Sequence, residues 1–221
     1  MAEFVIAALR ATPRIGRIAL VGPHPLPAAV AAQVDIAVRE RGELLENVGA
    51  GLEAIGGGDL VLAAAADIPL LTARAVDAFL DGAAALEGDI WYAAVPHDDV
   101  TQAYPHLRKT TVRLRDGAFT GGSLVLLRPQ VFARVRPLLE RAAGARKRPW
   151  ELARLFGPGT LVALAAGRLR IADLEERVVR LAGVRARAVI CRHPEIAIDV
   201  DRPETLAAIR DDLEQQAALP R

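Results

Sequence analysis

The sequence predicts an α/β fold in which helices cover both faces of a mostly parallel sheet, a three-layer α/β/α arrangement. Short apolar runs alternate along the chain with segments whose apolar residues recur at helical spacing. One such run, residues 59–66, ends abruptly on the carboxylate of Asp67, and Pro69 stops it. Because ligands of open α/β sheets bind where parallel strands end, Asp67 is the first candidate site residue.

The first half of the chain is expected to alternate between helices and strands. Thr72 suits the N-cap of a helix, and Gly56-Gly57-Gly58 suits a helix end. The expected elements are a helix over 2–11, a strand over 17–21, a helical turn over 28–33, a strand over 34–38, a helix over 43–55, the strand that ends at Asp67, a helix over 73–80 and a strand over 89–95.

The pattern changes in the second half. Residues 100–120 are polar and extended, and the turn at Asp116-Gly117 predicts a hairpin insertion laid over the sheet. In the last expected strand, a period of two places Asp199 and Asp201 on one face. The remaining expectations are a strand over 124–127, helices over 129–143, around 150–156 and over 171–182, an amphipathic segment over 161–169, a last strand over 195–201 and a closing helix over 205–215.

Length and composition narrow the class of protein. A chain of 221 residues fits one domain over 1–221. A net charge of +1 gives no electrostatic case for a nucleic-acid or membrane partner. The single cysteine, Cys191, cannot form an internal disulfide and is expected to be a buried, inert thiol. No apolar stretch reaches the ~20 residues of a membrane span, so we expect a soluble, cytoplasmic protein.

Three carboxylates stand at expected strand ends: Asp67, Asp199 and Asp201. They could converge on one Mg²⁺ ion, which binds through one or two carboxylates and substrate phosphates. Such an ion suits nucleotidyl transfer, because it neutralises a triphosphate while pyrophosphate leaves. The same residues could equally be turn or helix-capping carboxylates. Spacing alone leaves both interpretations open.

The chain resembles the MobA-like NTP transferases, nucleotidyltransferases of the GT-A type with a Rossmann-like fold. Four segments in the order found in that family carry the resemblance: Asn47-Val48-Gly49-Ala50-Gly51-Leu52, Ala66-Asp67-Ile68-Pro69-Leu70-Leu71, Phe119-Thr120-Gly121-Gly122-Ser123 and Asp199-Val200-Asp201-Arg202-Pro203-Glu204-Thr205-Leu206. They extend over nearly the whole chain. The resemblance implies transfer of a nucleoside monophosphate from a nucleoside triphosphate to a small-molecule acceptor that is phosphorylated or cofactor-like.

The resemblance also assigns roles to residues. It implies that Asp67 is the first metal ligand and that Asp199 or Asp201 is the second. It places the loop Thr120-Gly121-Gly122 beside the acceptor, and it makes Asn47 and Gly49 substrate-binding residues. The cations expected to meet phosphates are Lys109, Arg146 and Lys147. A homodimer that buries a sheet edge is also expected.

One departure from the family pattern is large. Members open with a strand and a glycine-rich loop whose amides hold the nucleotide phosphates, whereas this sequence begins at the following helix, Met1-Ala2-Glu3-Phe4-Val5. The N-terminal strand is therefore expected to be missing. Three interpretations follow: an active enzyme whose start is misplaced or trimmed, a catalytically impaired nucleotide- or cofactor-binding regulatory protein, or a GT-A glycosyltransferase with Asp199-Val200-Asp201 as its metal motif.

Overall fold

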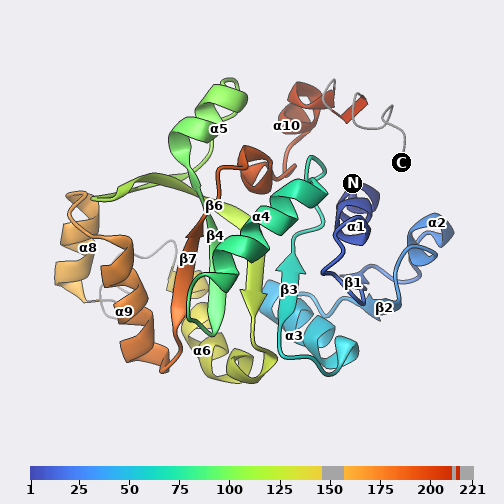
Figure 1. Ribbon diagram of the computed structural model, residues 1–221, viewed down its shortest axis with the longest axis horizontal. Coiled ribbons are helices and arrows are strands. Elements are labelled where there is room, and N and C mark those ends of the chain that lie inside the picture. Colours follow the sequence, from blue (N-terminus) through green and yellow to red (C-terminus); the bar gives the residue numbers. More distant parts are fainter. Residues whose placement is uncertain (146–156, 211–212, 215–221) are drawn as a thin grey trace.

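The computed structural model describes residues 1–145, 157–210 and 213–214, and its strands lie between two layers of helices (Figure 1). The larger sheet has the strand order β3-β6-β4-β7, with β5 paired to β6. A smaller sheet pairs β1 with β2 in parallel. The strands are β1 (Ala19–Gly22), β2 (Ile36–Arg39), β3 (Val61–Ala64), β4 (Ile90–Pro96), β5 (Thr111–Leu114), β6 (Gly117–Leu127) and β7 (Ala186–Ile190).

The strand directions confirm the predicted α/β fold with a mostly parallel sheet. Strands β3 and β4 both run antiparallel to β6, so they are parallel to each other, and β7 is parallel to β4. Among the described strands of the larger sheet, β6 alone runs against the rest. The carboxyl ends of β3, β4 and β7 therefore meet at one edge, where a site is expected.

The helices form a layer on each side of the larger sheet. Figure 1 shows α4 in front of that sheet and α6 behind it. Helix α1 packs against α4, α3 packs against β1, β2 and α6, and α9 packs against β7 and α6. The helical segments are α1 (Ala2–Arg10), α2 (Ala28–Ala31), α3 (Leu44–Ile55), α4 (Ala73–Ala84), α5 (His97–Ala103), α6 (Pro129–Ala145), α8 (Pro158–Ala165), α9 (Ile171–Ala182), the 3₁₀ helix η1 (Pro194–Ala197) and α10 (Pro203–Ala208).

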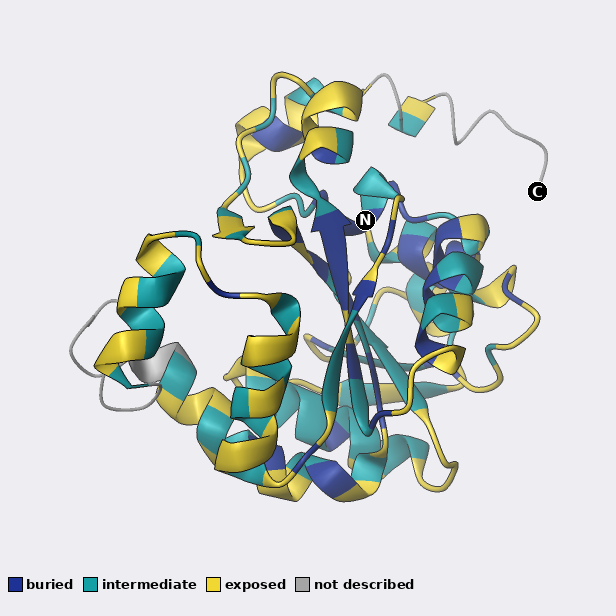
Figure 2. Cartoon of the chain, turned by 60° about the vertical axis from the view of Figure 1, so that its left-hand side comes forward, coloured by how far each residue is buried: buried dark blue, intermediate teal, exposed yellow. Residues whose placement is uncertain are grey.

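The core lies where α4, the larger sheet and η1 meet. Phe79 of α4, Val95 of β4, Leu124 of β6 and Ile196 of η1 have no exposed surface. Figure 2 shows the buried strands running through the centre, between exposed helix surfaces. Burying each large side chain of this kind stabilises the fold by about 1.5–3 kcal/mol, which keeps the carboxyl ends of the strands in register.

The predicted cap of α4 is confirmed. The Oγ1 atom of Thr72 accepts a hydrogen bond from the N–H of Ala75 at 3.1 Å, and its hydroxyl donates to Oε1 of Glu195 at 3.1 Å. An N-cap of this kind contributes about 1 kcal/mol. The second bond joins the start of α4 to η1, far away in the sequence.

In the last third, one predicted strand is wrong and one strand was not predicted. Residues 195–201 are not a strand: residues 194–197 form η1, and Pro194 has the fixed φ and missing N–H that suit the first position of a helix. Ile196, Ala197 and Ile198 are all buried, and a short apolar run of this kind reads alike in a strand and in a tight helix. The strand that joins the sheet is β7, which the sequence interpretation did not assign.

The insertion is partly as predicted. Strands β5 and β6 form the hairpin, and Gly117 makes its turn at a φ of +139°. The helix α5 at its start was not predicted. The closing helix α10 begins at Pro203 and ends at Ala208; residues 210 and 213–214 are helical again, and residues 211–212 and 215 of the expected helix lie outside the described residues. The helix expected around 150–156 lies outside the described residues.

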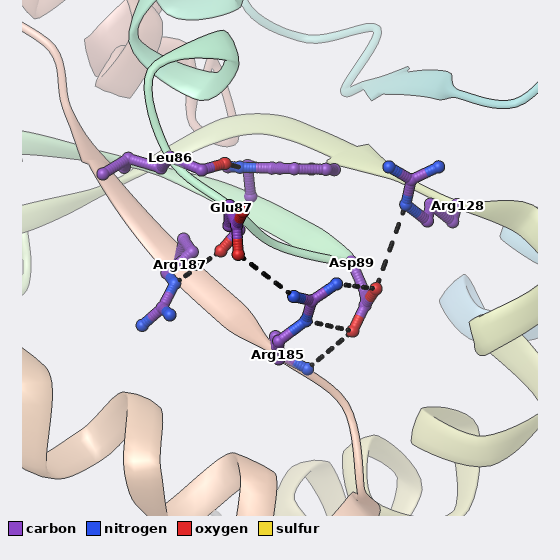
Figure 3. A network of polar contacts seen from close by, with 7 residues as sticks. Leu86, Glu87, Asp89, Arg128, Arg185 and Arg187 are labelled. Atoms are coloured by element: carbon purple, nitrogen blue, oxygen red, sulfur yellow. Dashed lines mark hydrogen bonds and ion pairs between the residues drawn. The ribbon is translucent and has the colours of Figure 1, made fainter.

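A polar network holds the sheet together at the edge away from Asp67. Asp89, just before β4, accepts a hydrogen bond from the backbone N–H of Arg185 at 3.0 Å and forms an ion pair with its guanidinium at 3.2 Å. Figure 3 shows Arg185 between Asp89 and Glu87, with Arg128 on the other side of the Asp89 carboxylate. The hydrogen bonds from Arg185 lower the pKa of Asp89, so this carboxylate stays charged at neutral pH.

No helix in the described ranges is both long enough and apolar enough to cross a membrane.

Candidate active site

Asp67 lies in the segment that follows β3, at the edge where the parallel strands end. Ile68 and Leu70 beside it are buried, so the segment is anchored in the core. The backbone N–H of Val200 donates to the carbonyl of Asp67 at 2.8 Å. This bond brings the two carboxylate-bearing segments of the sequence together.

One carboxylate oxygen of Asp67, Oδ1, is buried and has no hydrogen-bond partner among the described residues. Burial is the main reason why the pKa of Asp67 is raised above its ordinary value of 3.8. The negative charges of Asp199 and Asp201 raise this pKa further, while the ammonium of Lys109 lowers it. A buried carboxylate oxygen without a donor is costly, which makes it a candidate for binding a ligand.

Lys109, which the resemblance assigns to phosphate binding, lies beside Asp199. Its Nζ donates to the backbone carbonyl of Asp199 at 3.0 Å and forms an ion pair with the carboxylate of the same residue. The Lys109 side chain is only 12% exposed. An ammonium has three N–H donors, so one remains for a further acceptor such as a phosphate oxygen.

The three predicted carboxylates do not form a ready three-ligand cage. Among the described residues, no group of three or more His, Cys, Asp or Glu side chains is arranged to hold a metal ion. Asp199 is already engaged by Lys109. The donors are nevertheless of the right kind for Mg²⁺, because a hard cation prefers oxygen and binds through as few as one or two carboxylates.

A second polar cluster lies at the same edge and consists of His97, Thr111 and Thr120. Of these three residues, only Thr120 was predicted from the sequence. Thr120, predicted as a substrate contact, is buried in β6, and its Oγ1 lies 3.4 Å from Nδ1 of His97. Oγ1 of Thr111 lies 2.9 Å from the same nitrogen and also donates to the carbonyl of Lys109 at 3.3 Å. His97 directly follows β4, and that position after a strand was the available signal.

Gly121 and Gly122 lie inside strand β6, so the predicted loop at 120–122 is wrong, while a place beside the acceptor stays a prediction. A Cβ on Gly121 would lie 2.2 Å from the hydroxyl oxygen of Tyr92. A Cβ on Gly122 would lie 2.8 Å from Cβ of Ala93 and 2.8 Å from Cγ2 of Ile196. These glycines allow the side chains of β4 and η1 to pack closely against β6.

The other predicted contacts have different positions. Asn47 lies on α3 and its Oδ1 accepts the backbone N–H of Arg41 at 2.7 Å. Gly49 on the same helix faces Phe132, whose Cε1 would lie 3.3 Å from a Cβ at that position, so it is a packing contact with α6. Arg146 and Lys147 lie outside the described residues.

A large cleft of about 1550 Å³ opens onto Asp67. It is bordered by β1 and β3 and by side chains of α1 and α3, and its lining includes both Asp67 and Asn47. Gly49, Thr120 and Lys109 are not part of this lining. Asp67 thus borders the cleft, and the charges of Lys109 and Asp199 act on its carboxylate.

Several solved structures are similar to this chain. A structure described as a hypothetical transferase from Thermus thermophilus shares 40% identity, covers 93% of this chain and 85% of its own, and superposes with a TM-score of 0.83. The 4-diphosphocytidyl-2C-methyl-D-erythritol synthase from Anaerococcus prevotii shares 12% identity at a TM-score of 0.62, over 96% of this chain and 88% of that one.

A third similar structure is a CMP:2-keto-3-deoxy-manno-octonic acid synthetase complexed with CTP. It shares 13% identity at a TM-score of 0.59, over 97% of this chain and 88% of that one. A search of curated proteins gave no match. The MobA-like NTP transferase domain matches residues 1–154, more than half of the 221 residues. The chain therefore belongs to the MobA-like NTP transferase family.

Proposed function

We propose that this protein is a magnesium-dependent nucleotidyltransferase that moves a nucleoside monophosphate from a nucleoside triphosphate to a phosphorylated or cofactor-like acceptor. The observation that carries the proposal is the buried Oδ1 of Asp67, which has no hydrogen-bond partner among the described residues and lies at the carboxyl edge of the sheet. A carboxylate kept without a donor, next to two further carboxylates and a lysine, is better explained by a cationic ligand than by stability.

The donor set fits Mg²⁺. Asp67 would hold the ion with Asp199 or Asp201, and phosphate oxygens would complete its shell. Once bound, Mg²⁺ supplies charge neutralisation for the triphosphate. Burial raises the pKa of the Asp67 carboxyl group. Binding of the cation would offset the free-energy cost of its buried, ionised oxygen.

Lys109 would hold the nucleotide phosphates. Two of its three N–H groups are directed to Asp199, which fixes the ammonium in place. The third can donate to a phosphate oxygen without rearrangement of the side chain. Because Lys109 is mostly buried, its charge is screened less than that of a surface lysine.

The reaction needs one bond to form and one to break. An acceptor oxygen attacks the α-phosphorus, and the bond from this phosphorus to the oxygen that bridges to the β-phosphate breaks. The electron pair leaves with pyrophosphate. A phosphate monoester with a second pKa near 6 is already largely ionised at neutral pH, so a phosphorylated acceptor needs no residue to remove a proton.

The test is isothermal titration of the chain with GTP, CTP, ATP and UTP, each with and without Mg²⁺. We expect one nucleotide to bind in a magnesium-dependent manner, and Asp67→Asn to abolish that dependence. Asp59→Asn is the matched control, because Asp59 is an exposed carboxylate just before the other end of β3. Magnesium-dependent binding that survives in Asp67→Asn, or no binding of any nucleotide, would contradict the proposal.

A further inference from the structure

His97 links the end of β4 to the segment that carries Lys109. Its Nδ1 atom lies 2.9 Å from Oγ1 of Thr111 in β5 and 3.4 Å from Oγ1 of Thr120 in β6. The hydroxyl of Thr111 in turn donates to the backbone carbonyl of Lys109 at 3.3 Å. We propose that His97 is a positioning residue, which acts through Thr111 to hold the Lys109 ammonium ready for the phosphate groups of the nucleotide. This inference rests on the proposed function.

Lys109 belongs to a segment that the sheet itself does not fix. Residues 104–110 connect α5 to β5 and are neither helix nor strand. The pairing of β5 with β6 begins at Thr111, so Lys109 lies two residues before the ladder. A threonine hydroxyl can hydrogen-bond a nearby backbone group and so hold a segment of this kind. The bond from Thr111 to the carbonyl of Lys109 has this effect.

The hydrogen bonds place a hydrogen on Nδ1 of His97. A threonine hydroxyl has a single hydrogen, and Thr111 donates it to the carbonyl of Lys109. The oxygen of Thr111 then accepts a hydrogen bond from His97, so Nδ1 is the donor. A charged imidazole ring carries a hydrogen on both nitrogens, so the same bond persists when the ring is protonated.

His97 is itself held by the sheet. It is the first residue of α5, which continues directly from the end of β4 in Figure 1. Pro96 just before it still pairs with Phe119 of β6. Thr120, the next residue of β6, is buried and brings a second hydroxyl to the ring. The ring therefore has a fixed position between two paired strands and can serve as an anchor for a less regular segment.

Holding both ends of Lys109 favours binding of the nucleotide. At the far end, Nζ donates to the carbonyl of Asp199 at 3.0 Å and forms an ion pair with its carboxylate. At the near end, the backbone is bonded to Thr111. Lysine has a long, flexible stem, and ordering it before the ligand arrives removes that cost from the binding step. Loss of His97 should release the near end only, so it should lower affinity without removing the charge.

The first test follows the Lys109 amine and needs no nucleotide. The chain has two lysines, so acetylation with an N-hydroxysuccinimide ester and mass spectrometry can compare Lys109 with Lys147 as the internal reference. The Lys109 side chain is 12% exposed and ion-paired, and should react slowly in the wild type. We expect His97→Ala to raise its rate relative to Lys147 about fivefold, which corresponds to the loss of one hydrogen bond of about 1 kcal/mol.

Variants that keep or remove the Nδ1 contact make the test specific. His97→Asn places an amide near the position of Nδ1 and should restore acetylation to within about twofold of the wild-type rate. The amide of His97→Gln lies one carbon further out and should not restore it. Thr111→Ser should behave as the wild type, and Thr111→Val as His97→Ala. The matched control is His106→Ala, which changes an exposed histidine of the same segment and should have no effect.

The second test asks whether the position of the ammonium matters to the phosphates. Calorimetry with GTP, CTP, ATP and UTP in Mg²⁺ identifies the nucleotide that the wild type binds, and His97→Ala should weaken its binding about fivefold. In the Lys109→Met background the same substitution should cause no further loss, because its effect passes through Lys109. An equal loss in both backgrounds would overturn the inference.

Failure of the inference can be told apart from failure of the proposed function. Unchanged acetylation of Lys109 in His97→Ala, or fast acetylation in His97→Asn, would overturn the inference whether or not a nucleotide binds. Faster labelling of the buried Cys191 in His97→Ala would show a general loosening of the fold and would also overturn it. Absence of nucleotide binding by the wild type would contradict the proposed function, while the acetylation series would still decide whether His97 positions Lys109.

Discussion

Asp67→Asn should make the protein more stable while it removes the proposed activity. The substitution keeps the size of the side chain and removes its negative charge. In the native state this charge is half-buried, one of its oxygens has no donor within the described residues, and Asp199 and Asp201 repel it. In the unfolded chain, water solvates the same carboxylate fully, so the ionised carboxylate lowers the stability of the native state.

The direction of the pH dependence follows from the pKa of Asp67, which burial raises above 3.8. Between that ordinary value and the raised one, the native state binds more protons than the unfolded state. The free energy of unfolding therefore falls as pH rises through this window, and the full penalty is present at neutral pH. A neutral asparagine has no such penalty at any pH.

The expected increase in the free energy of unfolding of Asp67→Asn is small. A buried polar group without a partner costs about 1–3 kcal/mol, and the lower end applies because Asp67 is only half-buried. For a chain of this length a gain of about 1 kcal/mol raises Tm by about 2–4 °C. The difference between the two proteins should shrink as pH falls below the raised pKa, where the aspartic acid is protonated as well.

The assay is urea denaturation of the wild type, Asp67→Asn and Asp59→Asn at several pH values, without Mg²⁺. The exposed Asp59 serves as the control, and its substitution should change stability by no more than about 0.5 kcal/mol. An asparagine variant that is less stable than the wild type at neutral pH would refute the reasoning. It would mean that the Asp67 carboxylate makes favourable contacts and is not held ready for a cation.

Three further predictions concern other residues. Gly122→Ala should lower the free energy of unfolding in urea by about 1–3 kcal/mol, because its Cβ would meet two side-chain carbons at 2.8 Å. Gly159→Ala in α8, where a Cβ has open space, should be neutral or stabilising. Equal losses of stability in the two variants would show that the close packing at Gly122 is not limiting. Lys109→Met removes a mostly buried ammonium and should weaken the binding of the magnesium nucleotide by about tenfold in calorimetry. Unchanged affinity would show that Lys109 does not bind the phosphates. Cys191 has a pKa raised to about 11 by burial, so a thiol reagent at pH 8 should label it only as fast as the protein unfolds; immediate labelling of the native protein would contradict this.

The structure confirms those sequence predictions that rest on local patterns. Helical spacing predicted α1, α3, α4, α6 and α9 to within a few residues where an end was given, and Thr72 predicted the start of α4. Such signals work because a helix end must supply partners for its own backbone groups, whatever the rest of the fold does. Strand ends likewise pointed to Asp67, because an apolar run cannot continue through a carboxylate and a proline.

The predictions that failed depended on what packs against a segment. Residues 194–198 are apolar and buried in η1, and nothing in their sequence reveals that β7 already occupies the sheet position beside β4. Gly121 and Gly122 suggested a ligand loop, yet Tyr92 and Ile196 fill the space above them. A glycine serves close packing and close ligand approach equally well, so only its neighbours distinguish the two.

The sequence by itself determined the α/β class, the place of Asp67 at a strand end and the family resemblance, because these depend on residue order and short-range spacing. The tertiary structure alone decided that Lys109 meets Asp199 across 90 residues and that His97 joins Thr111 and Thr120. It also decided that Oδ1 of Asp67 has no donor in the part of the chain that the structure describes. Residues of β1 and β3, which are far apart in the sequence, line one cleft for the same reason. Contacts between distant segments depend on how whole elements pack, and one-dimensional periodicity carries no record of that packing.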